Sequence, residues 1–226
     1  MNDGVRGVVY SLTIGALVSA SLAYAQSMLV VEASRDLNGD GKADRVSIWL
    51  TQGKKYNDTE LWEGAGEKYE GHFVLRVEIA GKMPVTNDLN RLFYPQYDKE
   101  QPMFFWSSEP WEIFFADYNH DGRTDFNLGQ YGSGVACVFR IFTIPADGRV
   151  SELPLEGQTY GLLGPRIRTH STAQIEPTRD GFTHSYYSRL IGTGVKNWWR
   201  WDKDKGLFVL VKQEPPDKRP EHLPGN

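Results

Sequence analysis

Two nine-residue segments constrain this chain more than any other feature. Residues 36–44 read Asp-Leu-Asn-Gly-Asp-Gly-Lys-Ala-Asp, and residues 117–125 read Asp-Tyr-Asn-His-Asp-Gly-Arg-Thr-Asp. Both follow the pattern D-x-N-x-D-G-x-x-D, in which oxygen-bearing side chains alternate before a Gly and a closing Asp. Because Ca²⁺ takes about six to eight oxygen ligands and prefers carboxylates, amides and carbonyls, the pattern predicts two calcium loops.

The expected ligands occupy the same positions in both loops. Side chains come from positions one, three, five and nine, the Gly at position six permits a sharp turn, and position seven offers its backbone carbonyl. The first ligand set is Asp36, Asn38, Asp40, Lys42 and Asp44, and the second is Asp117, Asn119, Asp121, Arg123 and Asp125. The alternative interpretation is that these are ordinary Asp/Asn/Gly turns.

The residues after each loop exclude a standard EF-hand. That motif needs a Glu at position twelve, where this chain has Ser47 and Leu128. Each loop instead precedes a run that alternates like a strand, beginning at Arg45 and at Phe126. A calcium loop followed by a strand resembles the FG-GAP and VCBS repeats, which form blades of β-propellers.

Strand signals recur along the whole chain, with Gly/Asp turns between them and little sign of helix outside residues 87–93 or 58–69. The fold class is therefore all-β, with a small or irregular β-propeller-like architecture or, as the alternative, a β-sandwich. The two loops are about 80 residues apart, too far for adjacent propeller blades of about 40–50 residues, so either a degenerate blade lies between them or the sheets are irregular. Residues 54–71 and 129–134 are expected to be surface loops available to a partner.

The chain divides into three segments. Residues 1–25 read as a secretory signal peptide ending in Ala23-Tyr24-Ala25, with an uncleaved membrane anchor as the alternative. Residues 26–212 form one calcium-binding all-β domain, and residues 213–226 form a Pro-rich tail expected to be disordered. The protein is thus expected to be periplasmic or secreted, without stable membrane insertion after signal cleavage. Its only cysteine, Cys137, lies in an apolar run and is interpreted as a small buried hydrophobic residue.

Composition and motifs exclude several function classes. A net charge of −4 argues against nucleic acid as a partner. The five histidines are scattered, and neither an H-E-x-x-H nor a G-x-S-x-G motif is present. No catalytic residues are therefore assigned, and the protein is expected not to be an enzyme. A hydrolase with an unrecognised site is the weakest alternative.

Tryptophans are the candidate partner-binding side chains. Trp106 and Trp111 flank a turn near the second loop, and Trp199 and Trp201 lie in a terminal hairpin. Alternation places Trp198 and Trp199 on opposite faces of their strand, so at least one of these rings is expected to pack in the core. The others are candidates for a binding edge.

A closer resemblance covers residues 110–212. The second loop, a Gly-rich segment, an aromatic hairpin and the final Trp-Arg-Trp-Asp-Lys-Asp-Lys-Gly hairpin follow in an order similar to a family of periplasmic calcium-binding proteins of bacteria. The studied member of that family has a propeller-like fold and acts as an immunity protein against a peptidoglycan-hydrolysing effector of a type IV secretion system. The resemblance implies an exported, calcium-stabilised inhibitor of a lysozyme-like hydrolase, with up to two structural Ca²⁺ ions. The alternative is a non-catalytic module that binds a glycan or the cell surface.

Overall fold

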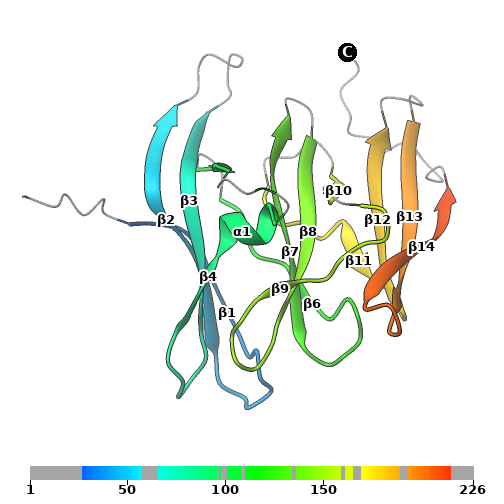
Figure 1. Cartoon of the computed structure of the whole chain (residues 1–226), viewed down its shortest axis with the longest axis horizontal. Helices are drawn as coiled ribbons and strands as arrows, with labels where there is room; N and C mark the ends of the chain where they lie inside the picture. Colours follow the sequence, from blue (N-terminus) through cyan, green and yellow to red (C-terminus); the bar gives the residue numbers. More distant parts are fainter. Residues whose placement is uncertain are drawn as a thin grey trace, which may run out of the picture.

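The computed structural model describes residues 27–57, 66–95, 97, 101–107, 110–133, 136–158, 161–164, 169–188 and 193–214. In this part of the chain nearly all regular structure is strand, arranged in three antiparallel sheets, none of which closes into a barrel (Figure 1). The all-β prediction is confirmed. Residues 1–25, the expected signal peptide, and residues 215–226 of the expected tail lie outside the described residues, while the last strand runs on to Glu214.

The first sheet, sheet A, comes from the N-terminal part of the chain and carries the first Asp-rich loop. Its strands run in sequence order, and the last two both pair with β3, one beyond the other. They are β1 (Met28–Arg35), β2 (Asp44–Asn57), β3 (Glu67–Glu78), β4 (Val85–Asp88) and β5 (Met103–Trp106). A short helix, α1 (Leu89–Phe93), follows β4 and is capped by the Asp88 side chain, which accepts the Arg91 amide. One of the two helical segments predicted from sequence is therefore confirmed.

The second sheet, sheet B, lies in the middle of the molecule and carries the second Asp-rich loop (Figure 1). Here too the strands follow in order, with the last two sharing one edge of β8. They are β6 (Phe115–Ala116), β7 (Thr124–Ser133), β8 (Ala136–Ile144), β9 (Ser151–Glu152) and β10 (Leu162–Leu163).

The third sheet, sheet C, ends the described chain. It is a four-stranded meander in strict sequence order. Its strands are β11 (Ile175–Pro177), β12 (Gly181–Ser188), β13 (Thr193–Asp202) and β14 (Leu207–Glu214). The predicted terminal hairpin is present, and its polar turn closes with a bond from the Gly206 amide to the Asp202 carbonyl.

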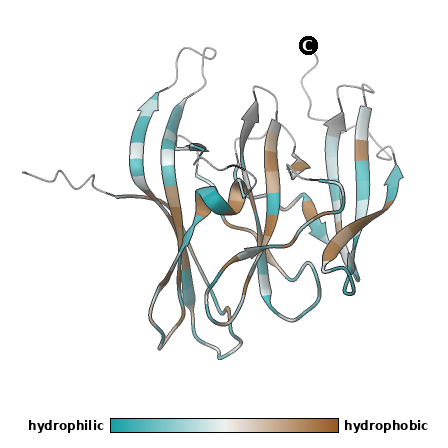
Figure 2. Cartoon of the chain, viewed as in Figure 1, coloured by the Kyte–Doolittle hydropathy of each residue, from teal (hydrophilic) through white to brown (hydrophobic). Residues whose placement is uncertain are grey.

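Sheet B is the central layer, and both of its faces are buried. Strand alternation sends Phe126, Leu128 and Phe142 into a core shared with sheet A. The alternate residues Phe139 and Ile141 enter a second core shared with sheet C. In sheet A, Figure 2 shows β2 hydrophobic towards its start, where its residues are mostly buried, and hydrophilic towards its far end, where they are mostly exposed.

Two expectations about loops are corrected by strand pairing. Residues 54–57 and 67–71, expected in a surface loop, are paired with each other in the β2–β3 hairpin. Residues 129–133, expected in a Gly-rich loop, belong to β7. The two Asp-rich loops lie on adjacent sheets. The long β2–β3 hairpin, β4, α1 and β5 occupy the sequence between them. The spacing of about 80 residues therefore comes from the remaining strands and the helix of sheet A, and no further sheet lies between the two loops among the described residues.

Candidate metal sites in the two Asp-rich loops

Both nine-residue segments fold into the same kind of turn between the first and second strands of a sheet. The first connects β1 to β2, and the second connects β6 to β7. Backbone φ is positive at positions four and six in each: Gly39 (76°) and Gly41 (79°) in the first loop, His120 (56°) and Gly122 (81°) in the second. Position six therefore requires the Gly that the pattern supplies, because other residues rarely adopt this conformation.

The position-one carboxylates organise the loop backbone. In the first loop, Asp36 Oδ1 accepts the amides of Asn38, Gly39 and Asp40 at 3.3, 2.7 and 3.2 Å, and Oδ2 accepts the Gly41 amide at 2.8 Å. These backbone bonds, with that of Gly41 contributing most, hold the pKa of Asp36 below its usual value.

The second loop uses fewer such bonds. Asp117 accepts the Asp121 amide at 3.2 Å and the Gly122 amide at 3.0 Å. Its side chain therefore keeps more capacity to accept further donors or to bind a cation.

Positions three, five and seven are arranged alike in the two loops. The Asn oxygen accepts the amide of the position-five Asp, at 2.9 Å in the first loop and 3.1 Å in the second. The Asp carboxylate accepts the amide of position seven, at 2.8 Å from Lys42 and 2.9 Å from Arg123. The side chains of Lys42 and Arg123 are exposed, as expected for residues proposed to contribute only a backbone carbonyl.

The closing carboxylates at position nine are both buried, Asp44 at 2% exposure and Asp125 at 0%. Each accepts the amide of position two through Oδ2, from Leu37 at 2.9 Å and from Tyr118 at 2.8 Å. Asp44 Oδ1 also accepts the Ala80 amide at 2.8 Å. Asp125 Oδ1, in contrast, is buried without a hydrogen-bond partner.

The surroundings of Asp125 disfavour its charge. Burial, with a smaller contribution from the nearby Asp121 and Asp117 charges, raises the pKa of this carboxyl to about 6. The Thr143 hydroxyl on the adjacent strand opposes this shift, but it makes no hydrogen bond of good geometry and is itself without a partner. A cation among these carboxylates would offset both the burial and the repulsion.

The donor set fits a hard cation, since it consists of carboxylate, amide and carbonyl oxygens. Within the described residues, no group of three or more His, Cys, Asp and Glu side chains is gathered closely enough to hold a metal. The other expected ligands, the Asn side chains and the backbone carbonyls of position seven, do not belong to these four residue types. The orphaned oxygen of Asp125 is thus the feature of this structure that fits a bound ion.

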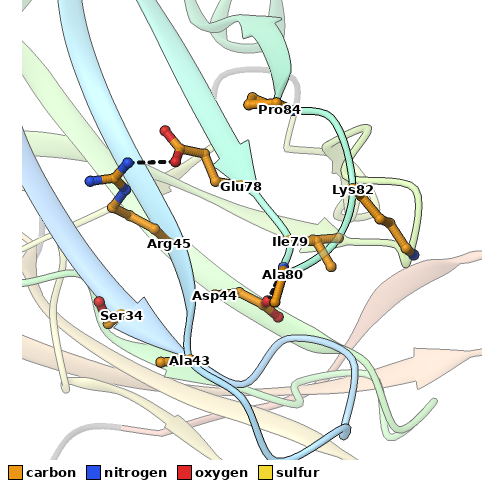
Figure 3. Close-up of a pocket in the computed structure, with 9 residues that line it drawn as sticks. All are labelled: Ser34, Ala43, Asp44, Arg45, Glu78, Ile79, Ala80, Lys82 and Pro84. Atoms are coloured by element: carbon orange, nitrogen blue, oxygen red, sulfur yellow. Dashed lines mark hydrogen bonds and ion pairs between the residues drawn. The ribbon is translucent and has the colours of Figure 1, made fainter.

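A surface pocket of about 380 Å³ adjoins the first loop (Figure 3). Its charged groups are already paired: Arg45 with Glu78, Lys82 with the Ala146 carbonyl at 2.6 Å, and Asp44 with the Ala80 amide. The pocket therefore adds no unsatisfied group to the first loop.

The candidate tryptophans lie mostly inside the protein. Trp106 and Trp199 are 4% and 2% exposed, so their rings present no surface to a partner. Trp111 and Trp201 are partly buried. The Trp111 ring stacks on Phe105 and the Trp201 ring packs against Phe208, with ring centroids 5.7 and 4.8 Å apart. As predicted, Trp198 and Trp199 lie on opposite faces of β13: Trp199 packs in the core shared with sheet C, and the Trp198 ring lies between Lys196 and Lys212.

A segment that was not predicted from the sequence, residues 169–172, forms a largely buried polar strap. His170 Nε2 accepts the Trp106 amide of sheet A at 2.7 Å, and its Nδ1 donates to the Gly129 carbonyl of sheet B at 2.8 Å. Ser171 and Thr172 bond to Asn127 on β7. A Thr-His-Ser-Thr segment carries no apolar pattern, so no sequence signal indicated its burial. Burial of Cys137 was correctly predicted, and it raises the pKa of this thiol to about 11.

Comparison with known proteins gives no family. No family model matches the chain, and searches of curated proteins and of solved structures find no significant match. Within the described residues, no helix has the length and apolar character needed to cross a membrane.

Proposed function

We propose that this protein is an exported, calcium-stabilised all-β protein that binds a macromolecular partner and has no catalytic role. The observation that carries the proposal is the buried Asp125 carboxyl, which closes the second loop with one oxygen unpaired. An unsatisfied buried polar group costs about 1–3 kcal/mol, and more when charged. A calcium ion held by the loop offsets this cost and the repulsion from Asp117 and Asp121.

The proposed architecture is an open arc of three propeller-like blades. Each sheet is a meander four strands wide, since in sheets A and B the last two strands share one edge. Each Asp-rich loop joins the first and second strands of its own sheet. In sheet C, the first two strands, β11 and β12, are joined by a short turn in which the Thr178 amide donates to the Gly181 carbonyl at 2.8 Å. Asp-rich loops on two blades and a short turn on the third would make the blades structural repeats that differ in the connection between their first two strands.

Thermal unfolding of the purified protein tests the calcium part of this proposal. A ligand that binds only the folded state adds about 4 kcal/mol of stability at a thousandfold excess over its Kd. We expect a higher Tm in millimolar Ca²⁺ than in EGTA, and a smaller rise in the same concentration of Mg²⁺. The absence of a calcium-specific rise would contradict the proposal and identify both segments as ordinary turns.

The proposed partner is a peptidoglycan hydrolase, and this step rests on the resemblance of residues 110–212. The test is a turbidity assay of cell-wall hydrolysis with any cell-wall hydrolase that a neighbouring gene encodes, combined with a binding titration for each. Stoichiometric inhibition is expected for one of them. If none is bound or inhibited, the inhibitor role fails while the calcium proposal stands. Glycan binding through Trp199 is not favoured, because that ring is buried.

A further inference from the structure

We propose that the two Asp-rich loops are inequivalent: the second is the tight calcium site that stabilises the fold, and the first closes without a cation. This inference rests on the proposed function, since it assumes that the protein binds calcium. The two motifs agree at every defining position, so the difference comes from their surroundings.

The position-one carboxylates differ in how completely they are already satisfied. Asp36 accepts backbone amides from four residues, whereas Asp117 accepts them from two. Amide donors stabilise a carboxylate charge much as a cation does. The first loop therefore gains less than the second when an ion binds.

The position-nine carboxylates differ in the same direction. Strand β3 ends at Glu78, and the Ala80 amide beyond it bonds to Asp44. In sheet B, β8 continues to pair through Ile144 and places the Thr143 side chain opposite Asp125. Thr143 makes no hydrogen bond to the free Asp125 oxygen, so the second loop retains an unsatisfied buried carboxylate that a cation can stabilise.

Burial strengthens this contrast. Asn119 in the second loop is 4% exposed, whereas its counterpart Asn38 is exposed. Charges that are less accessible to solvent are screened less by water and salt. The attraction between a cation and the second loop is correspondingly stronger.

The second loop is also connected to the neighbouring sheet. His120 Nε2 donates to the Thr178 carbonyl at 2.6 Å, and the Tyr118 hydroxyl donates to the Ile175 carbonyl at 3.3 Å. The first loop has Gly39 at the position of His120 and therefore no side chain to make such a bond. A cation that fixes the second loop thus stabilises the packing of sheet B on sheet C.

Matched substitutions at position five test the inference. Asp40 and Asp121 are both exposed, and each accepts the position-seven amide, a bond that Asn can retain. Calcium titration calorimetry is performed on the wild-type protein, Asp40→Asn and Asp121→Asn. Circular dichroism in EGTA establishes that all three are folded. We expect one tight site in the wild type, a loss of roughly tenfold or more in its affinity in Asp121→Asn because a charged ligand is removed, and no change in Asp40→Asn.

Unfolding provides a second readout. The calcium-induced rise in Tm is expected to persist in Asp40→Asn and to be largely lost in Asp121→Asn. Two sites of equal affinity, or a tight site lost in Asp40→Asn, would overturn the inequivalence and leave the proposed function intact. No calcium binding by the wild type would overturn both.

Discussion

The interface between sheets A and B and the interface between sheets B and C are built differently. The A–B interface is packed mainly by aromatic and aliphatic side chains, with Phe142 lying 5.4 Å from Phe126 and 5.5 Å from Phe93. His170 also joins sheets A and B by hydrogen bonds, but the B–C interface has fewer buried apolar residues and a larger hydrogen-bonded network, centred on Asn127. The second Asp-rich loop belongs to this polar interface through Tyr118 and His120.

This contrast separates two ways of joining sheets. The stabilisation from apolar packing is roughly proportional to the buried area and does not depend on direction, so such an interface tolerates small changes in position. Buried polar groups must find their partners or lose stability, so they define one arrangement. We infer that sheet C owes its position relative to sheet B to this network and to the loop beside it, and the following predictions test that difference.

Truncation within the apolar interface should have the largest effect. Phe142→Ala removes a fully buried ring and is expected to lower the free energy of unfolding by about 3–5 kcal/mol, as is usual for such cavities. Urea denaturation measures the loss, with Phe142→Leu as a milder control. A loss below about 1 kcal/mol would show that sheets A and B are not held mainly by this core.

Removing the centre of the polar network should cost somewhat less. The Asn127 side chain accepts the Thr172 amide at 2.8 Å and donates to the Thr172 carbonyl at 2.9 Å. Asn127→Leu leaves both groups unpaired, so we expect a loss of about 2–4 kcal/mol in urea denaturation. Hydrogen exchange should show faster opening of the strap, residues 169–172, than of β2 and β3. Uniform acceleration of exchange across all three sheets would contradict a specific role of this network in holding sheet C on sheet B.

The strap histidine predicts an acid sensitivity at the boundary of sheets A and B. Burial lowers the pKa of His170 to about 4, whereas an unfolded chain has a His pKa of about 6.5. Its stabilising contribution is full above pH ~6.5 and is lost as the pH falls towards 4, by up to about 3 kcal/mol, because the unfolded state takes the proton first. Urea denaturation of the wild type and His170→Gln at pH 7 and 4.5 measures this. Equal slopes with pH would contradict the assignment.

The smallest effect is expected at the bond between the second loop and sheet C. His120 has a positive φ of 56°, which costs a non-Gly residue about 1 kcal/mol, and its side chain contacts Thr178. His120→Ala keeps the strained backbone and loses the bond, so Tm in EGTA should fall by an amount equivalent to about 1 kcal/mol. His120→Gly relieves the strain and should lie close to the wild type. Equal losses in both variants would show that the side-chain bond outweighs the backbone term.

The sequence was sufficient for much of the fold and for the form of the loops. Alternating runs after the two loops predicted β2 and the first part of β7, and the terminal hairpin predicted β13–β14, because one buried face imposes a period of two. The pairing of residues 54–57 with 67–71 was missed, since Lys, Glu and Gly in this hairpin give no apolar alternation. Trp106 and Trp199 were candidates for a binding edge, yet each packs against residues distant in sequence that no local pattern reveals.

The nine residues of each Asp-rich segment determine their own turn, because the bonds that close it join residues at most seven positions apart. The strand that follows each loop is also determined locally, by the alternation of apolar and polar side chains along it. Whether a loop is satisfied is not local, because it depends on the adjacent strand. Asp44 meets the free amide of Ala80, while Asp125 meets the side chain of Thr143. Two nearly identical motifs thus acquire different chemistry from strand pairings that neither motif contains.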